Sequence, residues 1–533
     1  MEAPPEHGVS RQAVDEHAPG ETRSGSHAPW YRRASMAAFD AVFVGSGINS
    51  LAGGALLAQQ GWRVAILERE DRLGGCIHTS SDLTLPGFTH EVMASWHPLW
   101  TGGAAYGELK PELDRRGVAY VNTDVPTGST TPAGDSAFVW TSLEQNVAEM
   151  ERHATGDGAA WGAFFNGFMA NADLAFGMLG TELWSGAGLG LGRQAYKRLG
   201  RRGTLAFMGT TLSTCRDWVT ATFRSEAAHG LLAPWVLHTG LGPDQATSGF
   251  MTQVIAAALQ LGGMPVPVGG GRVLVEALAG IVRDAGGEVR SGADVEQILV
   301  TGGRATGVRL AGGESITATR AVAASVTPTQ LYGKLLGPDT TSTQVRKDAA
   351  AFRYGRGEMQ IHLALDEPPR WKGPRADLLA RSPLVHVTTG LDGVSRGVNE
   401  AERGLLPARS TIAVGQPCAL DPSRAPEGKA ILWIQLQELV GGPVKGDAAG
   451  QIDVGDGTWT EELREAYADR IVAHPARTSR TSQPPRRSAS SSLPSTSRRS
   501  TATSSAATST AARAPSTRTS SGARSPRPRG TGP

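Results

Sequence analysis

The first strong hydrophobic pattern is the run DAVFV at residues 40–44, which has the composition of a strand buried on both faces. Gly45, Ser46 and Gly47 interrupt the run. Residues 48–60 then place apolar side chains at helical spacing, and a second apolar strand, VAIL, follows at 64–67. The pattern predicts a strand, a glycine turn, a helix and a second strand within about thirty residues.

The spacing within this unit favours a dinucleotide. Gly45 permits a sharp turn, and Gly47 has no Cβ to keep a pyrophosphate away from the backbone. The following helix N-terminus, which begins beside Ser46 and Gly47, offers free N–H groups to phosphate. Ser50 takes the third glycine position and is small enough for helix and strand to pack closely. Glu68 lies 21 residues after Gly47, where a carboxylate accepts both hydroxyls of an adenosine ribose. A simple turn without a ligand is the alternative.

A glycine pair, Gly74 and Gly75, follows six residues after Glu68. This pair lets the backbone approach the diphosphate and ribitol of a long dinucleotide, a feature that NAD-binding units do not require. The pattern therefore favours FAD. Arg69 and Arg72 either add positive charge near the phosphates or lie solvated in the loop.

A second informative block spans residues 265–328. A helix is predicted after Gly269–Gly271, followed by strands at 288–290 and 295–300, two glycine hairpin turns and a buried strand at 321–325. This order predicts a three-stranded meander that returns to the main sheet. The backbone near Val295 is a candidate to pair with an adenine edge.

Residues 126–264 lack this dinucleotide pattern and are predicted to be rich in helices and aromatic side chains. The glycines of GLGLGR at 188–193 follow no strand, so they do not predict a phosphate loop. The apolar stretch 231–261 either lines a tunnel for a long apolar substrate or packs as core.

Catalytic residues are not identified by the sequence. His90, His97 and His238 are the histidine candidates, and a structural role is the alternative for each. Oxidation by a flavin needs a positioned substrate and a dry site more than a strong acid or base. The three cysteines are far apart and form no C-x-x-C pair, so neither a metal site nor a redox dithiol is predicted, and a reducing, cytoplasmic compartment is expected.

Charge is spread unevenly along the chain. The last 59 residues hold eleven arginines and no acid, whereas residues 1–474 carry 41 basic against 50 acidic groups. The acidic body does not predict nucleic-acid binding. No run approaches eighteen apolar residues, so no transmembrane helix is predicted, and peripheral contact with a membrane is left open.

Both ends of the chain differ from its middle. Residues 1–35 are polar, contain five acids and are expected to be a disordered extension before Met36. Residues 475–533 are built almost entirely from Ser, Thr, Pro, Ala, Arg and Gly. We expect a disordered tail whose composition is typical of a frameshifted GC-rich reading frame; an arginine-serine segment that binds RNA is the alternative.

The pairing of VGSGINSLAGGALLAQQGWRVAILEREDRLGG with GGGRVLVEALAGIVRDAGGEVRSGADVEQILVTGGRATGVRLAGGE resembles the phytoene desaturase-like carotenoid and retinoid oxidoreductases. Within that family the chain is most similar to the branch of pyridine nucleotide-disulfide oxidoreductase domain-containing protein 2 and its bacterial relatives. The resemblance covers about residues 36–474. It implies FAD bound by Gly45, Gly47, Glu68, the Gly74–Gly75 pair and Val295. The glycine-rich C-terminal segment with which the family covers the flavin is not recognised after His474.

We therefore expect an α/β protein with a discontinuous, glutathione-reductase-type FAD-binding Rossmann domain and an inserted α+β substrate domain. The expected FAD-binding parts are 36–125 and 265–335, and the expected substrate parts are 126–264 and 336–474. The predicted function is FAD-dependent oxidation or desaturation of an apolar small molecule. A degenerate flavin-binding protein that acts through partner contacts is the alternative.

Overall fold

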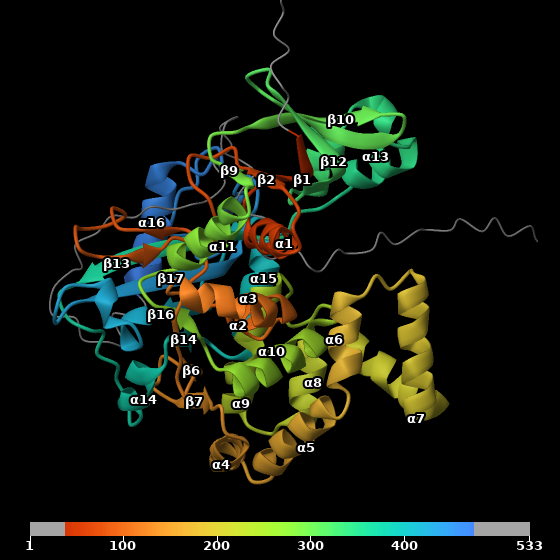
Figure 1. The fold of residues 1–533 in the computed structure, drawn as a ribbon. Helices are drawn as coiled ribbons and strands as arrows, with labels where there is room; N and C mark the ends of the chain where they lie inside the picture. The colour runs from red at the N-terminus through yellow and green to blue at the C-terminus, as the bar shows by residue number, and fades with distance from the viewer. Residues whose placement is uncertain (1–37, 474–533) are drawn as a thin grey trace, which may run out of the picture. The chain divides into compact units, whose positions relative to one another are not determined.

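The computed structural model describes residues 38–473, so the predictions for residues 1–35 and 475–533 lie outside the described residues. A first six-stranded sheet carries the predicted glycine turn (Figure 1). Its strands, in spatial order, are β10 (Val295–Thr301), β11 (Arg304–Leu310), β12 (Ser315–Ala324), β1 (Ala38–Val44), β2 (Val64–Leu67) and β9 (Glu288–Arg290). β1 is parallel to both β12 and β2, and β2 is parallel to β9. The predicted strand, helix and strand order around Gly45 is confirmed.

Helices cover this sheet where the sequence is apolar at helical spacing. α1 (Ile48–Gln59) and α11 (Arg272–Asp284) lie side by side against the strands, with α3 (Ala104–Arg115) beside them (Figure 1). Leu51 of α1 and Leu278 of α11 are fully buried in the shared core, together with Ile66 of β2. Burial of such side chains contributes about 2 kcal/mol each.

The meander is confirmed, but one of its strands differs from the prediction. The third meander strand and the returning strand are a single element, β12, which pairs with β11 at one end and runs along β1 over most of its length. The prediction that residues 321–325 are buried was wrong. Ala321 is exposed and Val322 is half-buried, and Ala323 is only partly buried against the core of the first sheet.

A second six-stranded sheet combines strands from residues 127–139 with strands from residues 357–439. Its order is β13 (Gly357–Leu365), β17 (Ala430–Leu439), β16 (Ile412–Gly415), β14 (Leu384–Val387), β6 (Thr127–Thr130) and β7 (Ser136–Val139). Only the β14–β6 pair is parallel, so the sheet is mixed. One of its faces is apolar and packs against α16 (Glu461–Ala473), where Tyr467 is buried.

The region between β7 and β8 is helical, as predicted. Its helices are α4 (Leu143–His153), α5 (Asp157–Met169), α6 (Ala172–Gly180), α7 (Gly186–Leu212), α8 (Cys215–Thr222), α9 (Glu226–Leu232), η1 (Ala233–Thr239) and α10 (Ser248–Gly262). Ser142, Thr214 and Ser225 cap three of them by accepting a hydrogen bond from the backbone N–H three residues later. The glycines at 188–193 lie inside α7 and form no phosphate loop.

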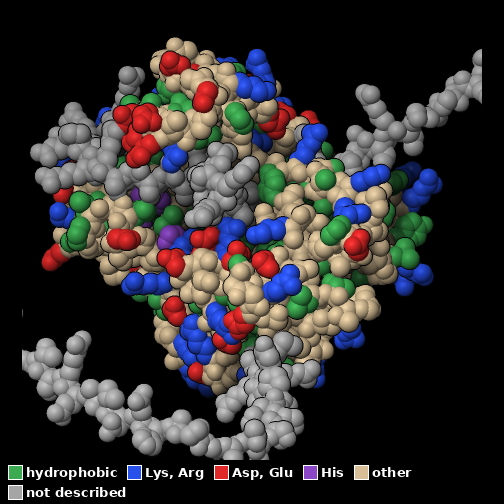
Figure 2. Space-filling view, turned by 90° about the horizontal axis from the view of Figure 1, so that it is seen from above, with side chains coloured by type: hydrophobic (Ala, Val, Ile, Leu, Met, Phe, Trp, Pro, Cys, Tyr) green, Lys and Arg blue, Asp and Glu red, His purple; other side chains and the backbone are tan. Residues whose placement is uncertain are grey.

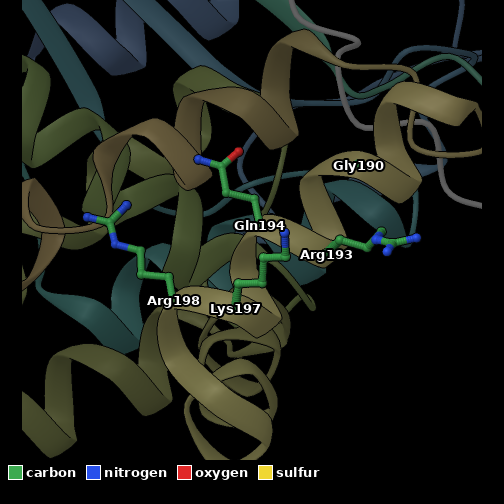
Figure 3. Close-up of a pocket in the computed structure, with 5 residues that line it drawn as sticks. All are labelled: Gly190, Arg193, Gln194, Lys197 and Arg198. Carbon is green, nitrogen blue, oxygen red and sulfur yellow. The ribbon is translucent and has the colours of Figure 1, made fainter.

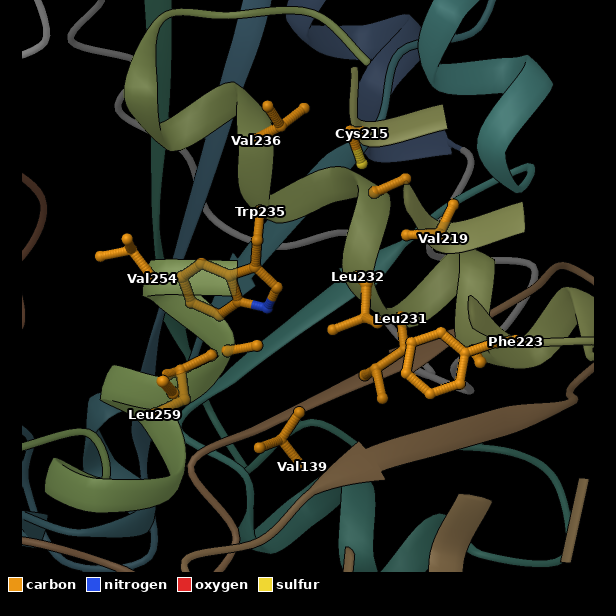
Figure 4. Close-up of a cluster of buried hydrophobic side chains, with 14 of the residues drawn as sticks. Val139, Cys215, Val219, Phe223, Leu231, Leu232, Trp235, Val236, Val254 and Leu259 are labelled. Atoms are coloured by element: carbon orange, nitrogen blue, oxygen red, sulfur yellow. The ribbon is translucent and has the colours of Figure 1, made fainter. Parts of the chain in front are cut away.

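The apolar stretch 231–261 packs mainly as core. Leu231, Leu232 and Trp235 contact Val254 and Leu259 in one cluster of buried side chains, which Figure 4 shows between η1, α9 and α10. Leu261, at the end of the stretch, is 55% exposed. Close packing explains these residues without a tunnel.

Short elements complete the described chain. Two-stranded pairs are formed by β3 (Thr79–Ser80) with β4 (His90–Glu91), β5 (Tyr120–Val121) with β8 (Val266–Pro267), and β15 (Leu405–Leu406) with β18 (Gly446–Asp447). The short helices are α2 (Pro98–Thr101), α12 (Pro328–Gln330), η2 (Leu331–Leu335), η3 (Pro338–Thr340), α13 (Thr343–Ala350), α14 (Ala376–Arg381), α15 (Leu391–Glu402), η4 (Pro417–Ala419) and η5 (Pro422–Arg424). Between residues 38 and 473, no helix is both long and apolar enough to cross a membrane.

Candidate functional site

The glycine turn leads directly into α1, whose N-cap is Gly47. Gly45 has a φ of 92°, which favours glycine, and the first intrahelical hydrogen bond runs from the N–H of Leu51 to the carbonyl of Gly47. No side chain caps this end, and the first turn of α1 holds no acidic residue. The first N–H groups of α1 therefore remain available for an anion.

Glu68 lies at the end of β2, beside this turn, and is 8% exposed. Its Oε2 accepts hydrogen bonds from the backbone N–H and from the hydroxyl of Ser46, both at 2.8 Å. Its Oε1 accepts one from the N–H of Glu70 at 3.1 Å. These bonds fix the carboxylate beside the helix N-terminus, and its oxygens keep lone pairs for further donors.

The glycine pair closes against the same turn. Gly74 forms an isolated parallel bridge with Gly47, and its N–H donates to the carbonyl of Ser46 at 3.2 Å. A Cβ on Gly75 would lie 3.1 Å from the Cα of Gly47, and Gly75 has a φ of 59°. Neither position of the pair tolerates a side chain, because the backbone of this loop packs directly against the glycine turn and its neighbours.

Two buried polar atoms around the turn have no hydrogen-bond partner among the described residues. These are the hydroxyl oxygen of Ser50 and Nη2 of Arg69. Arg69 also pairs with Glu70 at 3.0 Å through Nε. Arg72 donates instead to the carbonyl of Gly75 at 3.1 Å, so it supports the loop. Since buried polar atoms are rarely left unpaired, the free donors fit a phosphate-bearing ligand.

Val295 begins β10 and is buried. The chain just before it runs along the residues that follow β2: the N–H of Ala293 donates to the carbonyl of Glu68, and the N–H of Gly292 to that of Glu70, both at 2.7 Å. The structure thus brings the neighbourhood of Val295 to the Glu68 end of the turn, more than two hundred residues away in sequence.

Together these features fit FAD. The turn from Gly45 to Gly47 and the N-terminus of α1 suit the pyrophosphate, and Glu68 suits the ribose hydroxyls. The Gly74–Gly75 pair holds its loop against this turn with no side chain between them. When bound, FAD supplies a two-electron acceptor.

The three candidate histidines are buried or paired inside the protein. Nε2 of His90 lies 2.8 Å from the hydroxyl of Thr84, and Nδ1 of His97 lies 2.9 Å from that of Tyr120. Nε2 of His238 lies 3.1 Å from Nε2 of His386. Burial lowers the pKa of each of the three candidates to about 4, so all three rings are neutral at pH 7.

The second sheet carries an unexpected polar row on the face opposite to α16. One register line crosses it through Gln360, Gln435, Ala413, His386 and Ser129, all of them buried. The neighbouring line on the other face is apolar and includes Ile361, Ile434 and Val414.

The end of this polar row at His386 has unused hydrogen-bonding capacity. The ring of Trp235 stacks on that of His238 at 4.6 Å and meets that of His386 edge-on at 5.0 Å. Nδ1 of His386 and Nε1 of Trp235 are buried and have no hydrogen-bond partner among the described residues. Both atoms are therefore unsatisfied hydrogen-bonding groups inside the protein.

Sequence reasoning missed this row. The signal was present in EMQIHLAL at 358–365 and ILWIQLQEL at 431–439, where polar residues alternate with apolar ones in strands that lie wholly inside the protein. Period-two alternation normally indicates one solvated face. Only the fold shows that the polar face is buried instead.

The described part of the chain shows no group of three or more side chains arranged to hold a metal ion, and its three cysteines are unpaired. On the face seen in Figure 2, acidic and basic side chains are largely interspersed among those of described residues. An open hollow on the surface is lined by Gly190, Arg193, Gln194, Lys197 and Arg198, all from α7 (Figure 3).

The comparisons agree with this geometry. The chain belongs to the flavin-containing amine oxidoreductases, because the model of that family matches residues 51–522. It is therefore an FAD-dependent oxidoreductase, similar to the phytoene desaturases.

One of the subunits of the limonene dehydrogenase of Castellaniella defragrans is 23% identical over 81% of this chain and 77% of its own length. A neurosporene-forming phytoene desaturase of Cereibacter sphaeroides is 26% identical over 73% of this chain and 71% of its own. An oxidoreductase from Methanosarcina mazei shares the fold, with a TM-score of 0.51, 14% identity, and coverage of 85% of this chain and 87% of that one.

Proposed function

We propose that this protein removes hydrogen from an apolar small molecule, either oxidising or desaturating it, with FAD as the electron acceptor. The observation that carries the proposal is the assembly of the Gly45–Gly47 turn, Glu68 and the Gly74–Gly75 pair into one dinucleotide cradle. Relatives named as a limonene dehydrogenase and a phytoene desaturase, each matched over most of its length, support an apolar substrate class.

The two sheets suggest two modules, one for the cofactor and one for the substrate. The first sheet with α1 and α11 would form a glutathione-reductase-type FAD module, made of residues 36–125 and 265–335. The second sheet with α4–α10 would form the substrate module, made of residues 126–264 and 336–474. Val295 would offer its backbone to the adenine, and Arg69 its free Nη2 to the phosphates.

The residues of the substrate module would orient the substrate and keep water out. The packed core around Leu231 and Val254 excludes solvent on one side of the polar row. His386 and Trp235 would hydrogen-bond a polar group on an otherwise apolar molecule and so fix the carbon that loses hydrogen. A pre-positioned carbon lowers the barrier without a strong acid or base.

The test is anaerobic flavin reduction. Purified protein is reconstituted with FAD, and the absorbance at about 450 nm is followed while terpenes and carotenes are added. Bleaching by at least one such substrate is expected. FAD that binds stoichiometrically but is never bleached by any member of the panel would instead favour the alternative, a flavin-binding protein that acts through partner contacts. Protein that binds no FAD would contradict both.

A further inference from the structure

The helices α6 and α7, with the turn between them, expose an unusual amount of apolar surface. Of the sixteen large hydrophobic side chains that are exposed among the described residues, nine lie between Ala172 and Leu212. Trp184, in the turn, is 97% exposed, and Leu189 is 68% exposed. Scattered single apolar residues need no explanation, but a concentration of this kind marks a contact surface.

α7 is poorly covered by the rest of the protein. Only Ala195 and Thr211 are buried along its 27 residues, and a break at Gly200 divides it into two shorter helices. On the second of these, Leu205, Met208 and Leu212 follow one another at spacings of three and four residues, so they share a face, and each is more than half exposed. A helix gains little from exposing such a face to water.

Positive charge accompanies this apolar surface. α7 contains five cations and no acid: Arg193, Lys197, Arg198, Arg201 and Arg202. Arg198 is neutralised by Asp173 of α6 at 2.7 Å. Figure 3 shows the side chains of Arg193, Lys197 and Arg198 extending from one stretch of α7. Near the right edge of Figure 2, on the side where Figure 1 places α7, hydrophobic and basic side chains lie next to one another.

We propose that α6, α7 and the turn containing Trp184 form a docking surface for an anionic lipid bilayer. Apolar side chains flanked by Lys and Arg are the composition of helices that lie in the membrane interface, with the apolar face about 5–10 Å deep. Trp184 suits the headgroup boundary, where one edge of the indole is apolar and the other is polar. The bilayer would give apolar substrates a route to the protein.

The distribution of charge along the chain favours an anionic lipid surface, rather than a second copy of the protein, as the partner of this docking surface. Residues 1–474 carry more acids than bases, yet α6, α7 and the turn between them hold five cations against two acids, so within residues 1–474 an anionic surface is attracted to this segment more than to the rest. A symmetric dimer through α7 would place the cations of one copy against those of the other. This surface goes beyond the proposed function, because docking requires neither flavin nor substrate.

The test is co-sedimentation of the full chain with vesicles. Binding is expected to vesicles that contain phosphatidylglycerol, to be weak to pure phosphatidylcholine, and to decline as salt is added. Trp184→Ser with Leu189→Ser should weaken binding about tenfold or more, and so should Arg193→Gln with Lys197→Gln. The matched controls are Leu99→Ser, an exposed leucine of α2, and Lys110→Gln with Arg115→Gln on α3; these should bind as the wild type does.

Three outcomes would contradict the proposal. Equal binding by the α7 variants and the wild type would overturn it, as would equal losses in the variants and the controls. A dimer that forms without vesicles and dissociates in Trp184→Ser would show that a second copy covers the surface. Melting temperatures check that the variants fold. Brominated lipid should quench the fluorescence of the wild type more than that of Trp184→Phe, which reports contact directly.

Discussion

Arg424 and Glu91 form an ion pair that is wholly withdrawn from solvent, with 3.4 Å between Nη1 and Oε1. Arg424 belongs to η5, in the connection between two strands of the second sheet, and Glu91 to β4. The same Oε1 accepts a hydrogen bond from the N–H of Gly271, the N-cap of α11. Arg424 also donates to Asp421 at 3.1 Å and to the carbonyl of Pro267 at 2.6 Å. The pair therefore ties the second sheet to the helix that covers the first.

Replacing Arg424 by Met should destabilise the protein by about 3–5 kcal/mol, because Glu91 and Asp421 would be left buried without their cation. Denaturant unfolding at pH 7 measures the loss. Arg381→Met is the matched control, since Arg381 pairs with Asp124 at 2.9 Å on the surface and should cost less than about 1 kcal/mol. Similar losses in both variants would contradict a special role for the buried pair.

Glu149 gives a second buried contact of this kind. Nη1 and Nη2 of Arg375 bind its two oxygens at 2.6 and 2.7 Å, and its side chain is only 4% exposed. Burial alone would raise the pKa of Glu149, but hydrogen bonds from His153, Arg375 and Arg152 lower it to about 2. Arg375→Lys keeps the charge but loses the two-pronged contact, and should raise this pKa and cost about 1–3 kcal/mol in unfolding experiments. An unchanged free energy of unfolding would show that the paired contact of Arg375 with both oxygens of Glu149 is not needed for stability.

The cofactor cradle makes a prediction that does not depend on turnover. Gly75→Val should weaken FAD binding by at least about tenfold, because its Cβ would press on Gly47 and its φ is unfavourable for valine. Glu68→Ala should weaken it by a similar factor through lost ribose contacts. Fluorescence titration of FAD measures both. Gly61→Ala is the control, since a Cβ there meets no atom within 4 Å, although its φ of 81° costs some stability. Full FAD affinity in Gly75→Val would rule out the cradle.

Some residues of the candidate site could be predicted from the sequence, and others could not. Gly45, Gly47 and Glu68 were recognisable because the turn, the helix start and the carboxylate expected at a ribose have fixed spacings within one local unit. Val295 was named as a candidate for the adenine from the strand pattern and the family resemblance, whereas its approach to the Glu68 end of the turn is visible only in the fold. His386 was not recognisable, because its partners His238 and Trp235 lie about 150 residues away, in η1, and only the tertiary packing of η1 beside β14 brings them together.

Burial was the quantity least accessible to pattern reasoning. Residues 321–325 were predicted to form a buried strand because they are small and apolar. Small side chains also occur in strands that are only partly shielded from solvent. The helical region 126–264 was predicted, but not that one of its helices, α7, would be left largely uncovered. In both places burial depends on elements that are distant in sequence.

The last prediction concerns the stability of the protein at acidic pH. Burial lowers the pKa of His90, His97 and His238 to about 4, and that of His362 to about 3. The folded protein therefore holds these rings neutral, whereas the unfolded chain protonates them near pH 6.5. Below pH 6.5 the unfolded state binds more protons at these rings, so the rings lower the free energy of unfolding as the pH falls, until each ring also titrates in the folded state. Buried Glu438 acts in the opposite direction, because burial raises its pKa to about 8, but one carboxyl offsets only part of the effect of four rings.

A single ring whose pKa moves from 6.5 to about 4 contributes a loss of about 3 kcal/mol across that window, and several rings together are expected to remove much of the stability by pH 5. Urea unfolding at pH 7, 6 and 5 measures the slope. His90→Gln cannot take up a proton in this range and can still hydrogen-bond the hydroxyl of Thr84, so its stability should decline less steeply than that of the wild type. Glu149 and Glu438 do not obscure the comparison, because both carboxyls are present in the wild type and in His90→Gln and their contributions cancel in the difference between the two slopes. An equal slope in the wild type and in His90→Gln would show that the His90 ring is not kept neutral by the fold.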